Sequence, residues 1–372
     1  MKKIIVLGAG LVGKTIAIDL SKSFDVTSID QNGKALESLK AYPNIKLKKA
    51  NLNEEGAIRK LVADADLVIG AVPGFMGFST VREVIEAGKN MVDISFFPED
   101  SFELDDLAKN NGVCIVTDCG VAPGMGNIIL GYHHHKMEVE NFKCLVGGLP
   151  LKREWPWEYK AVFSPIDVIE EYTRPARYVL GGKLVTREAL SDPELVSFDE
   201  VGTLEAWNSD GLRSLIRTMK VPNMIEKTLR YPGTIEYLRV LRDTGYFSDQ
   251  EIEVNGRTIK PIDLTSKLLF SQWKLKPGER EFTVMRIEVE GSKSGLSKRF
   301  VYDLYDEFDE ATGMTSMART TGYTCTAVAN LLLQGKFSRK GINPPEFVGE
   351  QEGCYDFIFD YLKERSVNYK IH

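Results

Sequence analysis

Cysteine and histidine are scarce in this chain, and the few present follow no metal or disulfide pattern. Its 372 residues include five cysteines and four histidines, and no two cysteines have Cys-x-x-Cys spacing. An odd number of widely spaced cysteines indicates neither a disulfide framework nor a zinc knuckle. The three adjacent histidines at 133–135 cannot converge on one ion, so we interpret them as a polar surface turn. We therefore expect no bound metal and a reducing compartment, the cytoplasm.

Long apolar runs and basic clusters are also missing. No apolar run approaches the roughly 18 residues that a membrane span needs, and an apolar strand follows Met1 directly, so we expect no signal peptide. Forty-seven basic and fifty-three acidic residues give a net charge of −6, which argues against nucleic acid or an anionic membrane as the main partner. A hydrophobic content of 43% over this length is sufficient for two globular domains, each with its own core.

What is present begins with a glycine pattern in the first thirty residues. An apolar run at 4–7 precedes three glycines in G-x-G-x-x-G spacing, a helical segment follows, and a second strand ends at an aspartate. This order predicts a dinucleotide-binding turn in which the glycines admit a pyrophosphate at the helix N-terminus. The aspartate would accept the ribose hydroxyls and repel a 2′-phosphate, which favours NAD over NADP. The residues concerned are Gly8, Gly10, Leu11, Val12, Gly13 and Asp30. FAD, or a glycine turn without any cofactor, remains open on this pattern alone.

Strand and helix patterns alternate from residue 4 to about 117. The predicted strands are 4–7, 25–29, 44–50, 67–72, 90–94 and 113–117. Strands separated by helices of this length form a parallel, doubly wound sheet, whose ligands bind at the carboxyl ends of the strands. Asp93 and Asp118 lie at two such ends.

Beyond residue 126 the pattern changes to longer strands separated by polar turns. The predicted strands are 142–147, 177–186, 252–262, 282–289 and 300–306, and the alternation at 282–291 is that of a half-buried strand. A closing helix at 324–333 is expected to pack back on the first domain. These features predict a second, α+β domain with a mixed or antiparallel sheet.

Six motifs in order carry a family resemblance. They are DISFF at 93–97, DCGVAPGMGN at 118–127, GGLP at 147–150, YKAVFSP at 159–165, WNSDGLR at 207–213 and TLRYPG at 228–233. With the glycine turn, they resemble the saccharopine dehydrogenase family, and most closely its lysine 6-dehydrogenase branch. Saccharopine reductases of that family have an acidic residue where this chain has Ala122, which argues against saccharopine as the substrate.

The resemblance implies an α/β fold with an N-terminal Rossmann domain and an inserted domain. The implied boundaries are 1–125 for the Rossmann domain, 126–318 for the substrate and dimerisation domain, and 319–372 for C-terminal helices that return to the Rossmann domain. It also implies a homodimer, and hydride transfer between a nicotinamide and a carbon bearing an amine. Further cofactor contacts are expected at Val72, Pro73, Ser95, Phe96, Gly120 and, at the substrate–cofactor junction, Ser164.

Proton transfer and substrate binding have separate candidates. Asp93, Asp118 and Lys160 are candidates for moving protons, against the alternatives of a turn-capping carboxylate or a surface lysine. Free lysine carries a carboxylate and an α-ammonium far from its reacting carbon. A guanidinium binds a carboxylate in two places, whereas an amide or acid binds an ammonium. The substrate candidates are therefore Arg213 and Arg230 for the carboxylate, Asn208 and Asp210 for the ammonium, and Thr228 beside them. Glu170 and Glu171 are interpreted as a solvated helix face.

The predicted activity is NAD-dependent oxidative deamination of the ε-amino group of L-lysine, a small amino-acid substrate, to the semialdehyde. One alternative is reductive condensation of an amine with an aldehyde, as in saccharopine or carboxynorspermidine formation. Another is a nucleotide-binding protein without catalysis.

Overall fold

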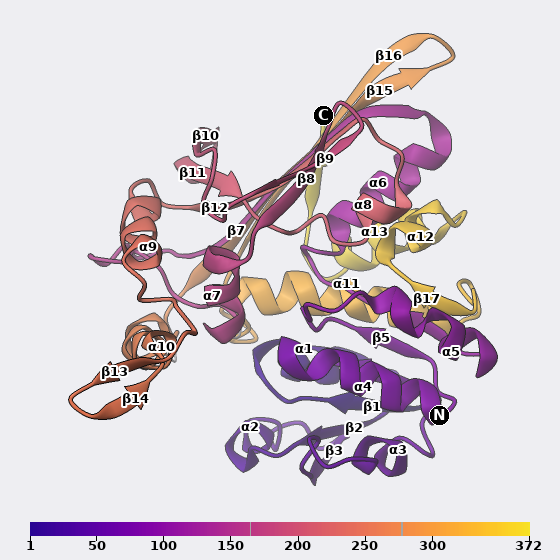
Figure 1. Cartoon of the computed structure of the whole chain (residues 1–372). Helices are drawn as coiled ribbons and strands as arrows, with labels where there is room; N and C mark the ends of the chain where they lie inside the picture. Colours follow the sequence, from indigo (N-terminus) through magenta and orange to yellow (C-terminus); the bar gives the residue numbers. More distant parts are fainter. Residues whose placement is uncertain (164, 277) are drawn as a thin grey trace. The chain divides into compact units, whose positions relative to one another are not determined.

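The computed structural model describes residues 1–163, 165–276 and 278–372, which divide into two compact units (Figure 1). Unit 1 comprises Met1–Lys136 and Met317–Asn368, and unit 2 comprises Met137–Ser316 and Tyr369–His372. Unit 2 is therefore inserted into the sequence of unit 1, apart from the last four residues. The boundaries of the functional domains stay a prediction.

Unit 1 contains a seven-stranded parallel sheet in the order β17-β6-β5-β4-β1-β2-β3. The run β3-β2-β1-β4-β5-β6 is the strand order of dinucleotide-binding folds, with the switch point between β1 and β4, so the predicted Rossmann sheet is confirmed. Its strands are β1 (Lys3–Leu7), β2 (Asp25–Asp30), β3 (Ile45–Lys49), β4 (Leu67–Gly70), β5 (Met91–Asp93), β6 (Cys114–Val116) and β17 (Gly341–Asn343). Its helices are α1 (Leu11–Leu20), α2 (Gly33–Glu37), α3 (Ala57–Leu61), α4 (Gly74–Glu86), η1 (Ser101–Leu104), α5 (Asp105–Asn110), α6 (Met125–Lys136), α11 (Ser316–Leu333), α12 (Pro345–Glu350) and α13 (Cys354–Lys363).

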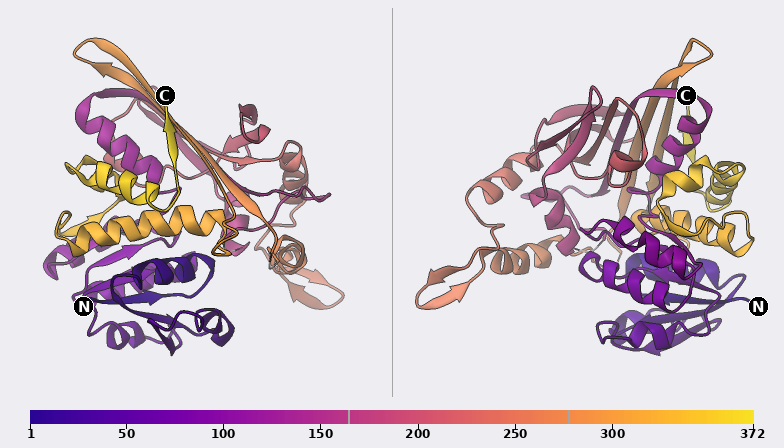
Figure 2. Two further views of the ribbon diagram at one scale, coloured as in Figure 1. Left: turned by 180° about the vertical axis from the view of Figure 1, so that it is seen from behind. Right: turned by 45° about the vertical axis from the view of Figure 1, so that its right-hand side comes forward.

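Unit 2 contains a nine-stranded mixed sheet whose main path is β10-β11-β12-β7-β15-β16-β18, with β8 paired to β12 and β9. Only β12 and β7 pair in parallel among its described strands. The long β15–β16 hairpin projects beyond the rest of this sheet (Figure 2). The strands of the nine-stranded sheet are β7 (Glu138–Pro150), β8 (Ala176–Leu180), β9 (Lys183–Arg187), β10 (Glu194–Phe198), β11 (Gly202–Asn208), β12 (Asn223–Arg230), β15 (Glu281–Lys293), β16 (Leu296–Glu307) and β18 (Tyr369–Ile371). The separate hairpin β13 (Ile252–Val254) and β14 (Arg257–Ile259) and the helices α7 (Pro165–Thr173), α8 (Leu215–Thr218), α9 (Thr234–Asp243) and α10 (Pro261–Trp273) complete the unit.

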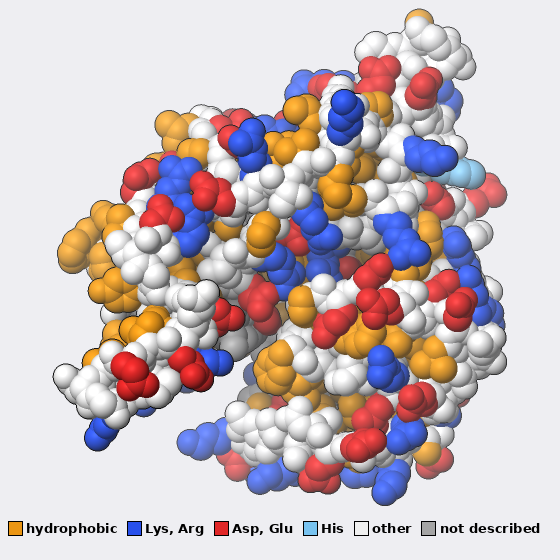
Figure 3. Space-filling model, viewed as in Figure 1, with side chains coloured by type: hydrophobic (Ala, Val, Ile, Leu, Met, Phe, Trp, Pro, Cys, Tyr) orange, Lys and Arg blue, Asp and Glu red, His pale blue; other side chains and the backbone are white. Residues whose placement is uncertain are grey.

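Large exposed hydrophobic side chains are concentrated on unit 2. Among the described residues, only Met1, Leu11 and Phe75 of this kind belong to unit 1. On the face shown in Figure 3, hydrophobic side chains gather over the region where Figure 1 places α9. Contiguous apolar surface of this kind is typical of an interaction site.

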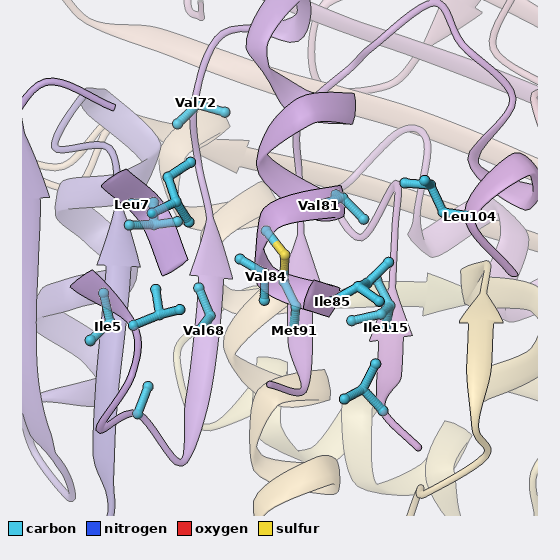
Figure 4. Close-up of a cluster of buried hydrophobic side chains, with 14 of the residues drawn as sticks. Ile5, Leu7, Val68, Val72, Val81, Val84, Ile85, Met91, Leu104 and Ile115 are labelled. Carbon is cyan, nitrogen blue, oxygen red and sulfur yellow. The ribbon is translucent and has the colours of Figure 1, made fainter. Parts of the chain in front are cut away.

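Each unit buries its own hydrophobic side chains. In unit 1, side chains of β1, β4, β5 and β6 pack against Val81, Val84 and Ile85 of α4 (Figure 4). In unit 2, one cluster includes Tyr172, Trp207 and Trp273, and a second cluster includes aliphatic side chains of β7, β11 and β12. These clusters hold the sheets that carry the predicted site residues.

Several local predictions are corrected. The predicted strands 177–186 and 252–262 are the hairpins β8–β9 and β13–β14, because glycines in the left-handed region, at Gly181, Gly182 and Gly256, reverse the chain. The predicted histidine turn is the last turn of α6. His133 is buried there, and burial lowers its pKa to about 4. None of the helices in the described part of the chain has the length and apolar character that crossing a bilayer requires.

Candidate functional site

The glycine turn between β1 and α1 has the geometry of a pyrophosphate cradle. Gly8 has a φ of +106°, and a Cβ there would lie 2.2 Å from the carbonyl oxygen of Ala71. A Cβ at Gly13 would lie 2.2 Å from the carbonyl oxygen of Gly8, whereas a Cβ at Gly10 would meet no heavy atom within 4 Å. Gly8 and Gly13 therefore allow the strand, turn and helix to pack closely, while Gly10 leaves open space for a ligand.

Helix α1 supports the same interpretation. It begins at Leu11 with neither a side-chain cap nor an acidic residue in its first turn. The N–H groups of Leu11, Val12 and Gly13 thus belong to a helix N-terminus whose partial positive charge is available to an anion. The residues present fit the pyrophosphate of a nicotinamide dinucleotide.

Asp30 ends β2 beside this turn. Its Oδ2 accepts a hydrogen bond from the Ala9 N–H at 2.7 Å, and its Oδ1 accepts one from the Asn32 N–H at 2.7 Å. These bonds fix the carboxylate, and each oxygen keeps a second lone pair for a ribose hydroxyl. A negative charge at this place would repel a 2′-phosphate bound beside it.

The carboxyl end of β5 carries a buried acid. Asp93 accepts hydrogen bonds from both the N–H and the hydroxyl of Ser95, each at 3.0 Å. Burial raises the pKa of Asp93 well above its usual range, the bonds from Ser95 oppose that rise, and the nearby charge of Asp118 adds to it. Asp93 packs against Gly70, where a Cβ would lie 1.9 Å from its Oδ1. The two hydrogen bonds hold Ser95 in place at the carboxyl end of β5.

Asp118 and the remaining cofactor candidates lie on neighbouring loops of unit 1. Asp118 is buried after β6 with a φ of +54°. Gly120 donates its N–H to the carbonyl of Pro123 at 3.0 Å in the same loop. The buried Val72 and the exposed Pro73 follow β4, and the half-buried Phe96 follows Ser95. Ser164 lies outside the described residues.

In unit 2, strand register decides which substrate candidates share a face. Trp207 lies opposite Thr228, and Asn208 lies opposite Lys227. Because alternate residues of a strand point to opposite faces, one face of the sheet carries Trp207, Glu226, Thr228 and Arg230, and we call it the polar face. Asn208 and Lys227 point to the other face, where Asn208 Nδ2 donates to Asp192 Oδ2 at 2.8 Å and Lys227 Nζ lies 3.0 Å from Glu194. The register therefore separates Asn208 from Arg230.

Arg230 is buried within aromatic side chains. Its NH2 donates to Glu171 Oε2 at 2.7 Å and its NH1 donates to the carbonyl of Leu229 at 2.9 Å. The guanidinium carbon lies 4.3 Å from the centre of the Tyr159 ring and 5.5 Å from that of Trp207. The arginine expected to bind a substrate carboxylate thus already has one carboxylate partner. The expectation that Glu171 belongs to a solvated helix face is wrong, because Glu171 balances this buried charge.

The other substrate candidates lie in the loop after β11 and on β12. Asp210 accepts two hydrogen bonds from Arg177, both at 2.8 Å. Arg213 is half-buried with a φ of +51°. Thr228 Oγ1 donates to Ser209 Oγ at 2.8 Å, and Ser209 Oγ donates to Glu226 Oε2 at 2.6 Å.

Lys160 is 9% exposed and has fixed partners. Its Nζ donates to the carbonyl of Gln272 at 3.0 Å and lies 3.6 Å from Glu279. Lys160 belongs to unit 2, whereas Asp93 and Asp118 belong to unit 1. No group of three or more potential metal ligands occurs among the described residues.

Sequence reasoning missed Glu171 and Glu226. Glu226 has a signal in the sequence, because it stands two and four positions before Thr228 and Arg230 in one strand and so shares their face. The partner of Arg230 has no such signal, because Glu171 is 59 positions away on α7.

The comparisons with known proteins agree with this fold. The family model for the saccharopine dehydrogenase NADP binding domain matches residues 4–116, and that for the saccharopine dehydrogenase C-terminal domain matches residues 120–367. A solved structure of saccharopine dehydrogenase (L-Glu forming) from Saccharomyces cerevisiae superposes with a TM-score of 0.80 at 19% identity, covering 100% of this chain and 99% of that one. At that identity the likeness concerns the fold.

Two curated relatives are similar in sequence. Saccharopine dehydrogenase [NADP(+), L-glutamate-forming] of Pyricularia oryzae is 24% identical over 72% of this chain and 63% of its own length. Carboxyaminopropylagmatine dehydrogenase of Synechocystis is 23% identical over 92% of each chain. The match thus spans less than two thirds of the first relative and nearly all of the second.

Proposed function

The chain belongs to the saccharopine dehydrogenase family, and we propose that it is an NAD-dependent dehydrogenase that deaminates the ε-amino group of L-lysine. The family has a nucleotide-binding dehydrogenase domain and acts on carbon–nitrogen bonds. In the proposed reaction, lysine with its ε-ammonium, NAD⁺ and water give the semialdehyde, NADH, ammonium and a proton.

The observation that carries the proposal is the polar face of the unit 2 sheet. A small zwitterionic substrate needs groups of both charges away from its reacting carbon. This buried face carries the guanidinium of Arg230 and the carboxyl of Glu226, and Asp210 follows at the end of the neighbouring strand. Ala122 in the place of an acidic residue supports a substrate smaller than saccharopine.

We assign separate roles to the residues of this chain. Gly8, Gly10 and Gly13 with the N-terminus of α1 would hold the dinucleotide, and Asp30 would select the unphosphorylated ribose. When bound, the nicotinamide accepts the hydride. Asp93 holds Ser95 at the carboxyl end of β5. Asp118 is the acid we assign to proton transfer, because the reacting amine must lose a proton before its carbon gives up hydride.

A direct assay tests this proposal. Purified protein is mixed with NAD and L-lysine between pH 7 and 10, and NADH is followed at 340 nm. We expect NADH formation that increases with pH, because a lysine ammonium has a pKa of about 10.4 and only the neutral amine reacts. Norleucine, which lacks the ε-amine, is the matched control and should give no NADH. Absence of NADH with lysine across this range would contradict the proposal.

A second candidate is the condensation of an amine with an aldehyde, favoured by the names of the two relatives. Its assay follows consumption of NADH or NADPH with the lysine semialdehyde and glutamate. Consumption there, together with no reaction of lysine alone, would favour the condensation. If NAD raised the melting temperature and no amine turned over, the chain would be a nucleotide-binding protein without catalysis.

A further inference from the structure

Glu226 is a buried carboxyl that lacks a cationic partner. It is 7% exposed, and its Oε2 accepts hydrogen bonds from Ser209 Oγ at 2.6 Å and from the Gly211 N–H at 3.0 Å. No lysine or arginine of the described chain forms an ion pair with it. The other acids nearby differ, since Asp210 pairs with Arg177 and Glu171 pairs with Arg230.

The groups around Glu226 make its negative charge unfavourable unless a cation binds beside it. Burial raises the pKa of Glu226 to about 7, the bond from Ser209 opposes that rise, and the charges of Glu171 and Asp210 add to it. Cys144, its neighbour on β7, is buried and its pKa is raised well above its usual range. A buried carboxylate without a countercharge is costly. A cationic ligand group would remove that cost.

Two unpartnered donors on the same face are a second sign of a ligand. Trp207 Nε1 and Arg230 Nε are both buried and form no hydrogen bond with any described residue. Trp207 lies opposite Thr228, which is two residues, or about 7 Å, from Glu226 along β12. Buried donors normally have acceptors, so this face has donors for a carboxylate close to an acceptor for an ammonium.

We propose that Glu226 binds the α-ammonium group of the substrate and so selects α-amino acids over simple amines. This inference rests on the proposed lysine-deaminating activity. The reacting ε-amine must be neutral when hydride leaves, and an ion pair with a carboxylate would keep it protonated. An anion without a countercharge therefore suits the ammonium that does not react. Trp207 is then placed to donate to the adjacent carboxylate.

The test compares two substrates and two variants. L-Lysine has an α-ammonium, whereas 6-aminohexanoate has the same reacting amine and a carboxylate but no α-ammonium. Glu226→Gln keeps the size and the acceptor oxygen and removes the charge. Glu194→Gln is the matched control, because Glu194 pairs with Lys143 and Lys227 on the other face of the sheet.

We expect Glu226→Gln to raise the Kd for lysine, measured by calorimetry, and its KM by roughly 10- to 100-fold. The KM for 6-aminohexanoate should change by less than about twofold in this variant, and Glu194→Gln should leave both values unchanged. In the unsubstituted protein the Kd for lysine should fall as pH rises from 6 to 8, since only the ionised Glu226 forms the ion pair. That dependence should vanish in Glu226→Gln.

Each contrary result has a separate meaning. An equal loss with both substrates, or an unchanged Kd for lysine, would overturn the role of Glu226. Lysine binding that needs Glu226 but gives no NADH would contradict the deaminase proposal alone. A protein that binds no lysine would overturn both.

Discussion

At the scale of the residue, the role of a charged group depends on which of its atoms already have partners. Asp30 uses one lone pair of each carboxylate oxygen for the backbone of Ala9 and Asn32. Those bonds hold the negative charge beside the glycine turn without neutralising it. The carboxylate therefore supports the turn, and in the proposed function it also selects the cofactor.

Replacing Asp30 by alanine should raise the KM for NAD about tenfold or more, because the two hydrogen bonds that the ribose hydroxyls would donate to the charged carboxylate are lost. It should also narrow the preference for NAD over NADP, since the repulsion of a 2′-phosphate disappears. The measurement is the ratio of kcat/KM for the two cofactors. Asp30→Asn, which keeps the acceptor for Ala9, controls for damage to the turn. An unchanged ratio in Asp30→Ala would mean that the carboxylate does not contact the ribose.

At the scale of the element, a buried carboxylate of α1 forms hydrogen bonds with residues of the C-terminal helices α11 and α13. Asp19 accepts hydrogen bonds from Arg365 at 2.9 and 3.0 Å, from Tyr361 at 2.7 Å and from Thr326 at 2.7 Å. These partners lie on α11, on α13 and just after it. A polar network thus joins α1 to α11 and to the end of α13.

We expect Asp19→Asn to destabilise unit 1 by about 2–4 kcal/mol, because Arg365 would lose its buried counterion and keep only the exposed Glu364. Burial opposes ionisation of Asp19, but the bonds from Arg365, Tyr361 and Thr326 prevail and lower its pKa. Its contribution is therefore complete above the unfolded pKa of about 4 and is lost as pH falls through the lower, folded value.

Melting temperatures at pH 7 and pH 3 measure this effect. The difference between the unsubstituted protein and Asp19→Asn should be large at pH 7 and smaller at pH 3. Lys22→Ala is the matched control, because Lys22 pairs with the same carboxylate while its side chain is 61% exposed, and surface pairs contribute under about 1 kcal/mol. Equal losses for the two variants would contradict the role of the buried network.

Local spacing predicts the elements and residues that depend on neighbours in sequence. The glycine turn, Asp30 and the first six strands of the unit 1 sheet follow from such spacing. Strand β17 does not, because three residues at 341–343 form a strand only by pairing with β6. Likewise, the burial of Arg230 depends on Glu171 from α7, and the separation of Asn208 from Arg230 depends on the β11–β12 register. These features arise from pairings between distant segments, which spacing does not reveal.

At the scale of the whole molecule, the two units differ in surface character. Leu11 and Phe75, two of the three large exposed hydrophobic residues of unit 1, lie just after the Gly8–Ala–Gly turn and just after Pro73. Unit 2 exposes many more, including Leu184 of β9, Leu195 of β10 and Leu268 of α10. A chain that dimerises through its inserted unit would cover such surface.

The homodimer remains a prediction, and light scattering after gel filtration measures it. We expect a mass near twice the 41.7 kDa of one chain. We place the interface of the predicted homodimer on the sheet of unit 2, so Leu184→Lys combined with Leu195→Lys should shift the protein toward monomer. Leu268→Lys on α10 is the matched control and should leave the mass unchanged. A single-chain mass at micromolar concentration would contradict the dimer. Dissociation by Leu268→Lys alone would place the interface on the surface of α10, because that substitution changes no other surface.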